Sequence, residues 1–145
     1  MYSEIADVQR FIKWFTFKED SIPLNNSDVR HFIKEADSKI DGMINRIYFV
    51  PIVDSTDIEI VSFISARFAA YSIAKILVGQ AGGEIPDTIQ EAKNEAEERL
   101  NAILSLAIIL ENTPFKIEKG RAVYSHTAHD PEAPAIKWKV DKEQW

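Results

Sequence analysis

The segment between Ile58 and Gly79, IEIVSFISARFAAYSIAKILVG, restricts what this chain can fold into more than any other stretch. Its residues are apolar or small nearly all the way round a helix, and the polar interruptions are thinly spread: Ser62, Ser65, Arg67, Ser72 and Lys75. A helix with so little polar surface has to be covered on most of its sides. We therefore expect this segment to be the central helix of a bundle, or to lie buried between subunits.

Both ends of this central helix carry sequence signals. Thr56 and Glu59 form a T-x-x-E pattern, a capping box in which each side chain satisfies a free backbone N–H of the other residue. Gly79 and the loop GQAGGE that begins there predict the C-terminal end, because glycine readily adopts the left-handed conformation of a helix cap.

A second helix, about 20 residues long, is predicted upstream of the central one. One of residues 25–27, NNS, supplies its N-cap, and Asp28 suits the positive end of a helix. Pro51 favours extended geometry for the residue before it, so the helix ends earlier. Spacings of three and four define one apolar face, which consists of Val29, Phe32, Ile33, Ala36, Ile40, Met43, Ile44 and Ile47.

A short first helix is expected from about Glu4 to Ile12, with Ser3 as its N-cap. Large aromatic residues cluster at its end and just beyond it, at Phe11, Trp14, Phe15 and Phe17. This aromatic run is either a loop that closes the helical core or a subunit contact, since aromatic residues are enriched at interface cores. The candidate subunit-interface residues are therefore Phe11, Trp14, Phe15, Phe17, Phe68 and Tyr71.

A fourth helix follows Pro86, whose missing N–H costs nothing in a first helical turn. Its outer face, KNEAEER, has charges of both signs and is expected to be solvated. The run SLAIILEN after it either completes the helix or begins a strand, because periodicity cannot decide so short a run. The side chains expected to face inward are Ile89, Ala92, Ala96, Leu100, Ile103 and Leu104.

The character of the chain changes from Glu111, where helical periodicity stops and prolines and short alternating segments appear. We therefore predict a mainly α fold: a compact helical bundle over residues 1–110, with about four helices, and an extended C-terminal arm over residues 111–145 that contains short strand segments. The candidate partner-docking residues of this arm are Phe115, Ile117, Tyr124, Ile136, Trp138, Val140 and Trp145.

Composition excludes several classes of protein. The chain has no cysteine, which excludes disulfide frameworks, thiol catalysis and zinc sites that use thiolates. The start MYSEIADVQRF lacks the basic residues and apolar core of a signal peptide. No stretch reaches the ~18 uninterrupted apolar residues of a membrane span. We expect an intracellular protein with no membrane partner.

The charge distribution argues against a nucleic-acid binder. Residues 1–110 carry 11 Lys/Arg and 17 Asp/Glu, whereas residues 111–145 carry six of each. Affinity for nucleic acid comes mostly from cations that neutralise phosphates. Residues 1–110, with their excess of acidic side chains, are therefore expected to repel DNA rather than bind it.

The motif HTAHD places His126 and His129 three residues apart, next to Asp130. A zinc site needs a rigid scaffold, usually another ligand, and second-shell support, and a proline-flanked arm is a poor scaffold. We interpret these residues as a solvated turn or polar contact. The sequence has no Glu-x-x-His pair, P-loop, nucleophile elbow or dinucleotide-binding fingerprint. We expect no metal, no cofactor and no catalytic residue.

Carboxylates that recur at helical spacing are likewise explained by exposure to solvent. Asp37 and Asp41 are i,i+4 neighbours, and Glu91, Glu95 and Glu98 line the fourth helix, each set beside lysines or arginines. Solvation of a wet helix face explains them better than a hydrolytic carboxylate pair. A surface ion pair with Asp28 or Glu35 likewise explains His31.

Three stretches resemble a known family. These are the opening YSEIADVQRF, the segment ADSKIDGMINRIYFVP at residues 36–51, and the helix rich in Ala, Tyr and Ile after it. They are similar to the small head–tail connector proteins of tailed bacteriophages and prophages, also called adaptor or head-completion proteins. The order of elements matches over residues 1–110. The motif consists of Ile40, Asp41, Arg46, Tyr48 and Pro51, with Ile47 separating an Arg-Tyr pair that is adjacent in many relatives.

The resemblance implies a helical subunit of a ring, commonly a dodecamer, that docks under the portal protein in the virion neck after assembly in the host cytoplasm. DNA would pass through the ring without specific binding, and a stopper or tail-terminator protein would attach on the tail side. An acidic conduit suits DNA that slides without sticking. The alternating Ile136, Trp138 and Val140 suit strand addition to a neighbour.

A second class of function stays open at this point. A helical regulatory or small-ligand-binding module would be a monomer or dimer, and it would have a defined apolar pocket among its first three helices. The arm would be dispensable in that case.

Overall fold

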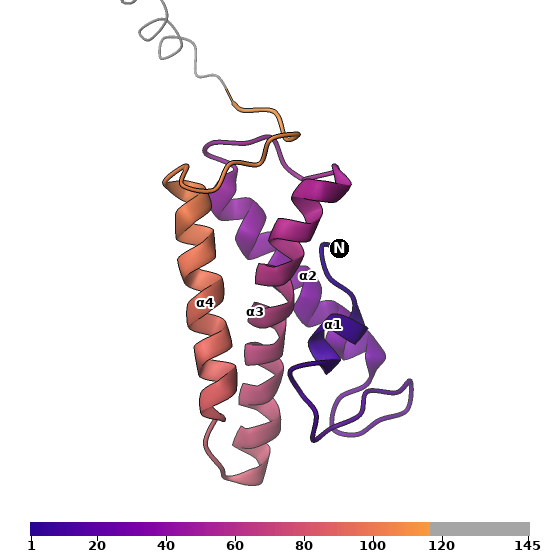
Figure 1. The fold of residues 1–145 in the computed structure, drawn as a ribbon. Coiled ribbons are helices and arrows are strands. Elements are labelled where there is room, and N and C mark those ends of the chain that lie inside the picture. The colour runs from indigo at the N-terminus through magenta and orange to yellow at the C-terminus, as the bar shows by residue number, and fades with distance from the viewer. Residues whose placement is uncertain (117–145) are drawn as a thin grey trace, which may run out of the picture.

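The computed structural model describes residues 1–116, which fold into four helices (Figure 1). These are α1 (Ile5–Gln9), α2 (Asn26–Ile44), α3 (Ser55–Ala81) and α4 (Asp87–Leu104). No strand occurs within these residues, so the prediction of a mainly helical bundle is confirmed. Residues 117–145, and with them most of the predicted arm, lie outside the described part of the chain.

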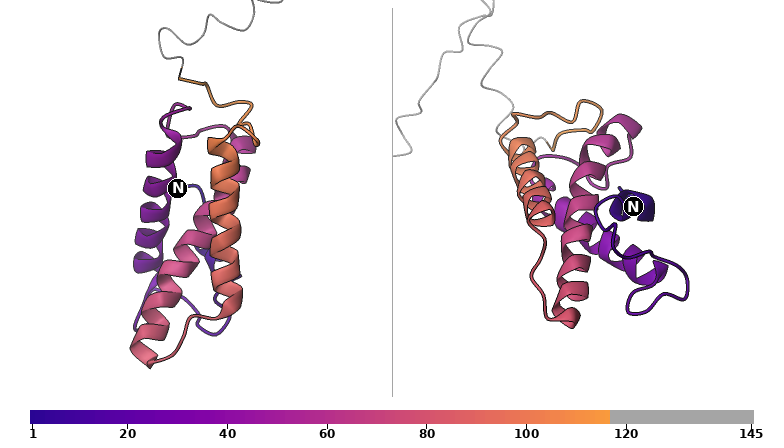
Figure 2. Two further views of the ribbon diagram at one scale, coloured as in Figure 1. Left: turned by 90° about the vertical axis from the view of Figure 1, so that its left-hand side faces the viewer. Right: turned by 60° about the horizontal axis from the view of Figure 1, so that its bottom comes forward.

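The central position of α3 is confirmed, because this helix contacts α1, α2 and α4 (Figures 1 and 2). Small buried residues along α3 allow the neighbouring helices to come close; they are Ala66, Ala69, Ala70 and Ala74. Larger side chains fill the space between the helices: Val61, Ile64, Phe68 and Ile73 are buried. Each fully buried aliphatic side chain of this kind contributes about 1.5–3 kcal/mol.

By length and hydropathy α3 is also apolar enough to cross a membrane. Within residues 1–116, half of its most apolar window is buried against the rest of the protein. The core helix of a bundle meets the same criterion, since it too must be apolar on most sides.

The ends of α3 differ from the prediction. Its N-cap is Asp54, whose carboxylate accepts the backbone N–H of Thr56 at 2.9 Å and of Asp57 at 3.3 Å. Thr56 already lies inside the helix and is exposed, so the expected capping box with Glu59 does not form. The C-cap is Gly82, at φ 69°, and the predicted terminator Gly79 is still helical.

The prediction for α2 is confirmed. Its N-cap Asn25 accepts bonds from the N–H groups of Ser27 and Asp28, and the Asp28 carboxylate accepts the N–H of Asn25 in return. The buried positions all belong to the predicted apolar face: Val29, Ile33, Ala36, Ile40 and Ile44.

The first helix is shorter than predicted and has a different cap. α1 ends at Gln9, and its N-cap is Glu4 rather than Ser3. Ser3 is buried and its hydroxyl lies 2.8 Å from that of Ser65 on α3, so it is engaged in a tertiary contact. Gln9 then organises the next loop, because its amide donates to the carbonyls of Ile12 and Phe15 and its oxygen accepts the N–H of Phe17.

The run after α4 is neither helix nor strand. α4 buries Ile89, Ala92, Ala96, Leu100 and Ile103, five of the six residues expected to face inward, and Leu104 is partly buried. The chain then turns at Leu106, a non-glycine residue at φ 61°, and the N–H of Ile108 donates to the carbonyl of Ala102 at 3.0 Å. This turn sends Leu110 back into the core.

The position of the α3 cap is tested by replacing Asp54 with alanine. Asp54→Ala is expected to lower the free energy of unfolding by about 1 kcal/mol, because it removes the acceptor for two free N–H groups. Thr56→Ala is the matched control and should change it by less than about 0.5 kcal/mol, as for an ordinary exposed site. Urea denaturation followed by circular dichroism measures both. A larger loss for Thr56→Ala would contradict the assignment.

Candidate functional site

Two loops meet at one end of the bundle and form a surface that we call the loop platform, residues 45–54 and 105–116 (Figures 1 and 2). Asp57, in the first turn of α3, is only 1% exposed. Its carboxylate accepts the N–H of Asn112 at 3.0 Å and the hydroxyl of Thr113 at 2.6 Å. Breaking such buried bonds leaves polar groups unsatisfied, so they hold the second loop firmly on α3.

The two loops of the platform also bond to each other. The N–H of Phe49 donates to the carbonyl of Pro114 at 3.0 Å, and the N–H of Lys116 donates to the carbonyl of Ile47 at 2.7 Å. This short antiparallel pairing places the ring of Tyr48 4.7 Å from the ring of Phe115, centroid to centroid. The Tyr48 hydroxyl accepts the N–H of Leu110 at 3.2 Å. These contacts hold the two loops of the platform together.

Large apolar side chains project from this platform into solvent. The residues are Phe49, Val53, Leu106, Ile109 and Phe115, which are 43–82% exposed. Clustered exposed apolar residues on an ordered scaffold are typical of a protein-interaction surface. Phe115 was predicted as a docking residue, whereas Phe49, Val53, Leu106 and Ile109 were not singled out. The apolar run SLAIILEN is the only sequence feature that points to Leu106 and Ile109.

A second apolar surface lies where α3 ends, and we call it the α3-end groove. This open groove of about 450 Å³ is bordered on one side by Trp14, Phe15 and Pro23. On the other side are α3 and the turn after it: Leu77, Val78, Gln80, Ala81, Gly83 and Glu84. The predicted aromatic run thus supplies one wall of a groove.

The predicted subunit-interface residues are distributed over several environments. Phe17 and Phe68 are buried in the core of the bundle, at 7% and 6% exposure, which leaves little of either side chain for a partner. Trp14 is 50% exposed. Phe15 packs against the core and lines the α3-end groove, and Tyr71 is half-buried beneath the ammonium group of Lys93.

Phe11 packs against the core of the bundle, beside Arg67 of α3. The Arg67 guanidinium lies 4.8 Å from the centre of the Phe11 ring and 3.2 Å from that of Phe63. Burial lowers the pKa of Arg67 from its usual value, and Glu95, 3.4 Å away, opposes that shift. An arginine that stacks on aromatic rings and pairs with a carboxylate stabilises the contact between helices.

The expectation that Asp37 and Asp41 are merely solvated is wrong. The Asp37 carboxylate accepts the backbone N–H of Tyr2 at 2.9 Å and the hydroxyl of Ser65 at 2.6 Å. Because Ser65 has one hydroxyl proton, Ser3 donates its own to Ser65. The two carboxylates hold the N-terminal residues against α2 and α3.

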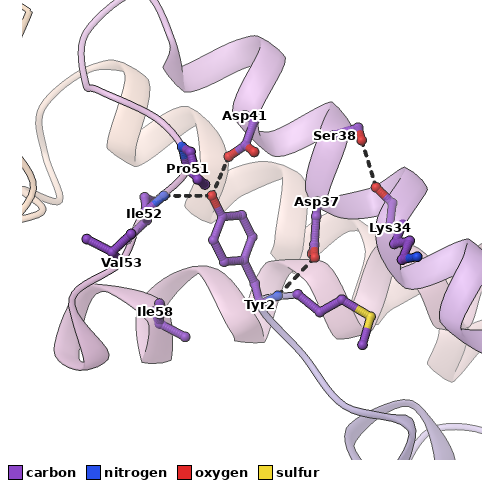
Figure 3. A pocket seen from close by; sticks show the side chains of 10 residues that line it. Tyr2, Lys34, Asp37, Ser38, Asp41, Pro51, Ile52, Val53 and Ile58 are labelled. Carbon is purple, nitrogen blue, oxygen red and sulfur yellow. Dashed lines mark hydrogen bonds between the residues drawn. The ribbon is translucent and has the colours of Figure 1, made fainter.

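Tyr2 connects this polar cluster to the platform loop (Figure 3). Its hydroxyl donates to Asp41 and accepts the N–H of Ile52 at 2.9 Å. Burial, reinforced by the bond to Asp41, raises the pKa of Tyr2 well above its usual value, so the phenol stays protonated. An open groove of about 630 Å³ lies over these residues and is lined further by Lys34, Ser38 and Val53.

The other chemical candidates have surface or structural roles. His31 lies 3.3 Å from Glu35 on the exposed face of α2, as predicted. Glu95 pairs with Arg67, and Glu91 and Glu98 are exposed. Within residues 1–116, no group of three or more histidine or carboxylate side chains is arranged to hold a metal ion.

Several predicted site residues lie outside the described part of the chain. They are Ile117, Tyr124, His126, His129, Asp130, Ile136, Trp138, Val140 and Trp145. Comparisons with protein-family models, with curated proteins and with solved structures find no match. Function is therefore inferred from the residues and their geometry.

The attachment of the platform is tested at Asp57. Asp57→Ala is expected to lower the free energy of unfolding by about 2–3 kcal/mol, because it leaves the buried hydroxyl of Thr113 and the partly buried N–H of Asn112 without their acceptor. Glu59→Ala, an exposed carboxylate in the same helix, is the control and should have little effect. Thermal and urea unfolding measure both variants. Equal losses would show that Asp57 does not anchor the loop.

Proposed function

We propose that the protein is a non-enzymatic structural subunit that assembles into a ring and serves as a head–tail connector of a tailed bacteriophage or prophage. The observation that carries this proposal is the presence of two different exposed apolar surfaces. The loop platform lies at one end of the bundle, and the α3-end groove lies near the other (Figure 1). A ring needs a head-to-tail contact between two unlike surfaces, whereas a twofold dimer pairs one surface with itself.

Residues 36–51, the segment that resembles the connector family, support this proposal. Ile40 is buried in the core, and Asp41 accepts the hydroxyl proton of Tyr2. Tyr48 is buried beneath the platform, where its hydroxyl accepts the N–H of Leu110. Of these motif residues, Asp41 thus holds the N-terminus and Tyr48 supports the platform.

In this proposal the ring, a dodecamer, docks under the portal protein of the capsid and lies in the virion neck. A stopper or tail-terminator protein attaches on the tail side. The excess of acidic residues over basic ones in residues 1–110 lets DNA pass without specific binding, since phosphates are repelled. The arm supplies additional docking residues.

A regulatory or small-ligand-binding module is the second candidate function. The groove over Tyr2, Asp37 and Asp41 favours it, because a cleft with convergent polar groups suits a small molecule. Such a module predicts a monomer or dimer. The mass of the full-length protein in solution therefore separates the two functions.

The ring proposal is tested by light scattering coupled to gel filtration and by electron microscopy of the purified full-length protein. Rings with an open centre are expected. A protein that stays monomeric at high concentration and fails to bind purified portal rings would contradict the proposal.

The role of the platform is tested by Phe49→Asp. Phe49 is 55% exposed, so this substitution should preserve the fold while placing a charge in the proposed contact. We expect at least a tenfold weaker assembly, since about 1.4 kcal/mol of lost contact energy has that effect. Ser38→Asp, at an exposed position on α2, is the control and should assemble normally. Equal assembly of both variants would exclude the platform from the interface.

A further inference from the structure

The α3-end groove is an apolar surface with one charged side chain, Glu84, among the residues that line it. Its walls are mostly apolar side chains, with Trp14, Leu77 and Val78 among them. The two chain segments that contribute these walls beyond α3, residues 13–25 and 79–87, carry two lysines and four acidic residues. A ligand complementary to this groove would therefore have an apolar face with positively charged side chains next to it.

A segment with alternating apolar and basic residues lies outside the described part of the chain. In residues 133–140, APAIKWKV, apolar residues alternate with two lysines, and no acidic residue occurs. In an extended conformation, alternate side chains point to opposite sides, so Ile136, Trp138 and Val140 share one face. Lys137 and Lys139 would then lie on the other side, where they can reach a border that carries Glu84.

The length of the intervening chain permits this contact between subunits. Lys116, the last described residue, lies at the platform end of the bundle, and the groove lies near the opposite end (Figure 1). α3 has 27 residues and is therefore about 40 Å long. The chain between Lys116 and Ile136 can extend over roughly 65–70 Å. It can therefore leave its own subunit and run the length of an adjacent one.

We infer that the α3-end groove of each subunit binds the segment Ile136–Val140 of a neighbouring copy. Trp138 fills the apolar floor, and the long side chain of Lys137 or Lys139 bends back to pair with Glu84 at the rim. This inference rests on the proposed ring, and it assigns the arm to the ring itself rather than to the portal or the tail-side protein. Each subunit thereby holds the next through an exchanged segment.

Disulfide cross-linking tests this inference directly, because the natural chain has no cysteine and gives no background. Full-length Ala81→Cys and full-length Ala135→Cys are purified separately, mixed and mildly oxidised. We expect a disulfide between the two chains, identified by mass spectrometry of the linked peptides. Such a bond forms only when the two Cα atoms come within about 7 Å.

Matched variants show whether the disulfide-linked product reflects the proposed contact. Asn94→Cys replaces Ala81→Cys as a control at an exposed position on α4 and should give no linked product with Ala135→Cys. Adding Trp138→Ala to Ala135→Cys should abolish the product, whereas adding Trp145→Ala should leave it. Equal linkage from Asn94→Cys, or linkage that survives Trp138→Ala, would overturn the inference.

Two further outcomes separate this inference from the ring proposal. Rings in the electron microscope without the mixed disulfide would refute the groove contact and leave the connector function standing. In a protein that carries both cysteines on one chain, a disulfide confined within each chain would assign the groove to its own arm. That result would overturn the contact with a neighbour.

Discussion

The rest of the fold depends on the need to cover α3. A helix that is apolar on nearly every side gains stability only when other elements remove it from water. α2 and α4 cover two of its sides, and α1 covers part of a third. The alanines of α3 let these helices come close, and Phe68 and Ile73 fill the wider spaces between them. The bundle is therefore organised around one helix rather than around a pair of equal layers.

Buried hydrogen bonds then decide how the ends of the bundle are closed. Asp57 attaches the segment after α4 to the start of α3, and Asp37 and Asp41 attach the N-terminus to α2. A buried polar group without a partner costs several kcal/mol in an apolar environment, so these contacts define single positions for the loops. Loops fixed in this way can display Phe49 and Phe115 to a partner with little further loss of conformational entropy.

The same arrangement connects the fold to the proposed function. The platform projects apolar side chains into solvent, while the α3-end groove is a concave apolar surface with Glu84 at its border. Unlike surfaces of this kind suit repeated head-to-tail assembly, and a long C-terminal segment with alternating apolar and basic residues can strengthen each contact. No catalytic step is needed for such a role, because it rests on shape, apolar area and charge.

The helical bundle, the start of α2 and the inward faces of α2 and α4 could be predicted from the sequence, whereas α2 ends at Ile44, before the predicted face residue Ile47. The spacing of residues such as Val29, Ile33 and Ala36 is a local property, and a buried stripe follows from it directly. The sequence also identified Phe115 and the aromatic run as candidate contact residues, and the structure places Trp14 and Phe15 at a groove. The arm residues from Ile117 onward remain predictions from the sequence.

Only the tertiary structure decided the remaining features. Ser3 could not be assigned by local rules, because its partner Ser65 lies 62 positions away in the sequence. The same holds for Asp37, whose side chain satisfies Tyr2 and Ser65, and for Asp57, which satisfies Asn112. A polar side chain on a helix face can be solvated or can bond to a distant segment, and the local pattern is the same in both cases. The choice is made by packing, because the folded chain brings together donors and acceptors that the sequence keeps far apart.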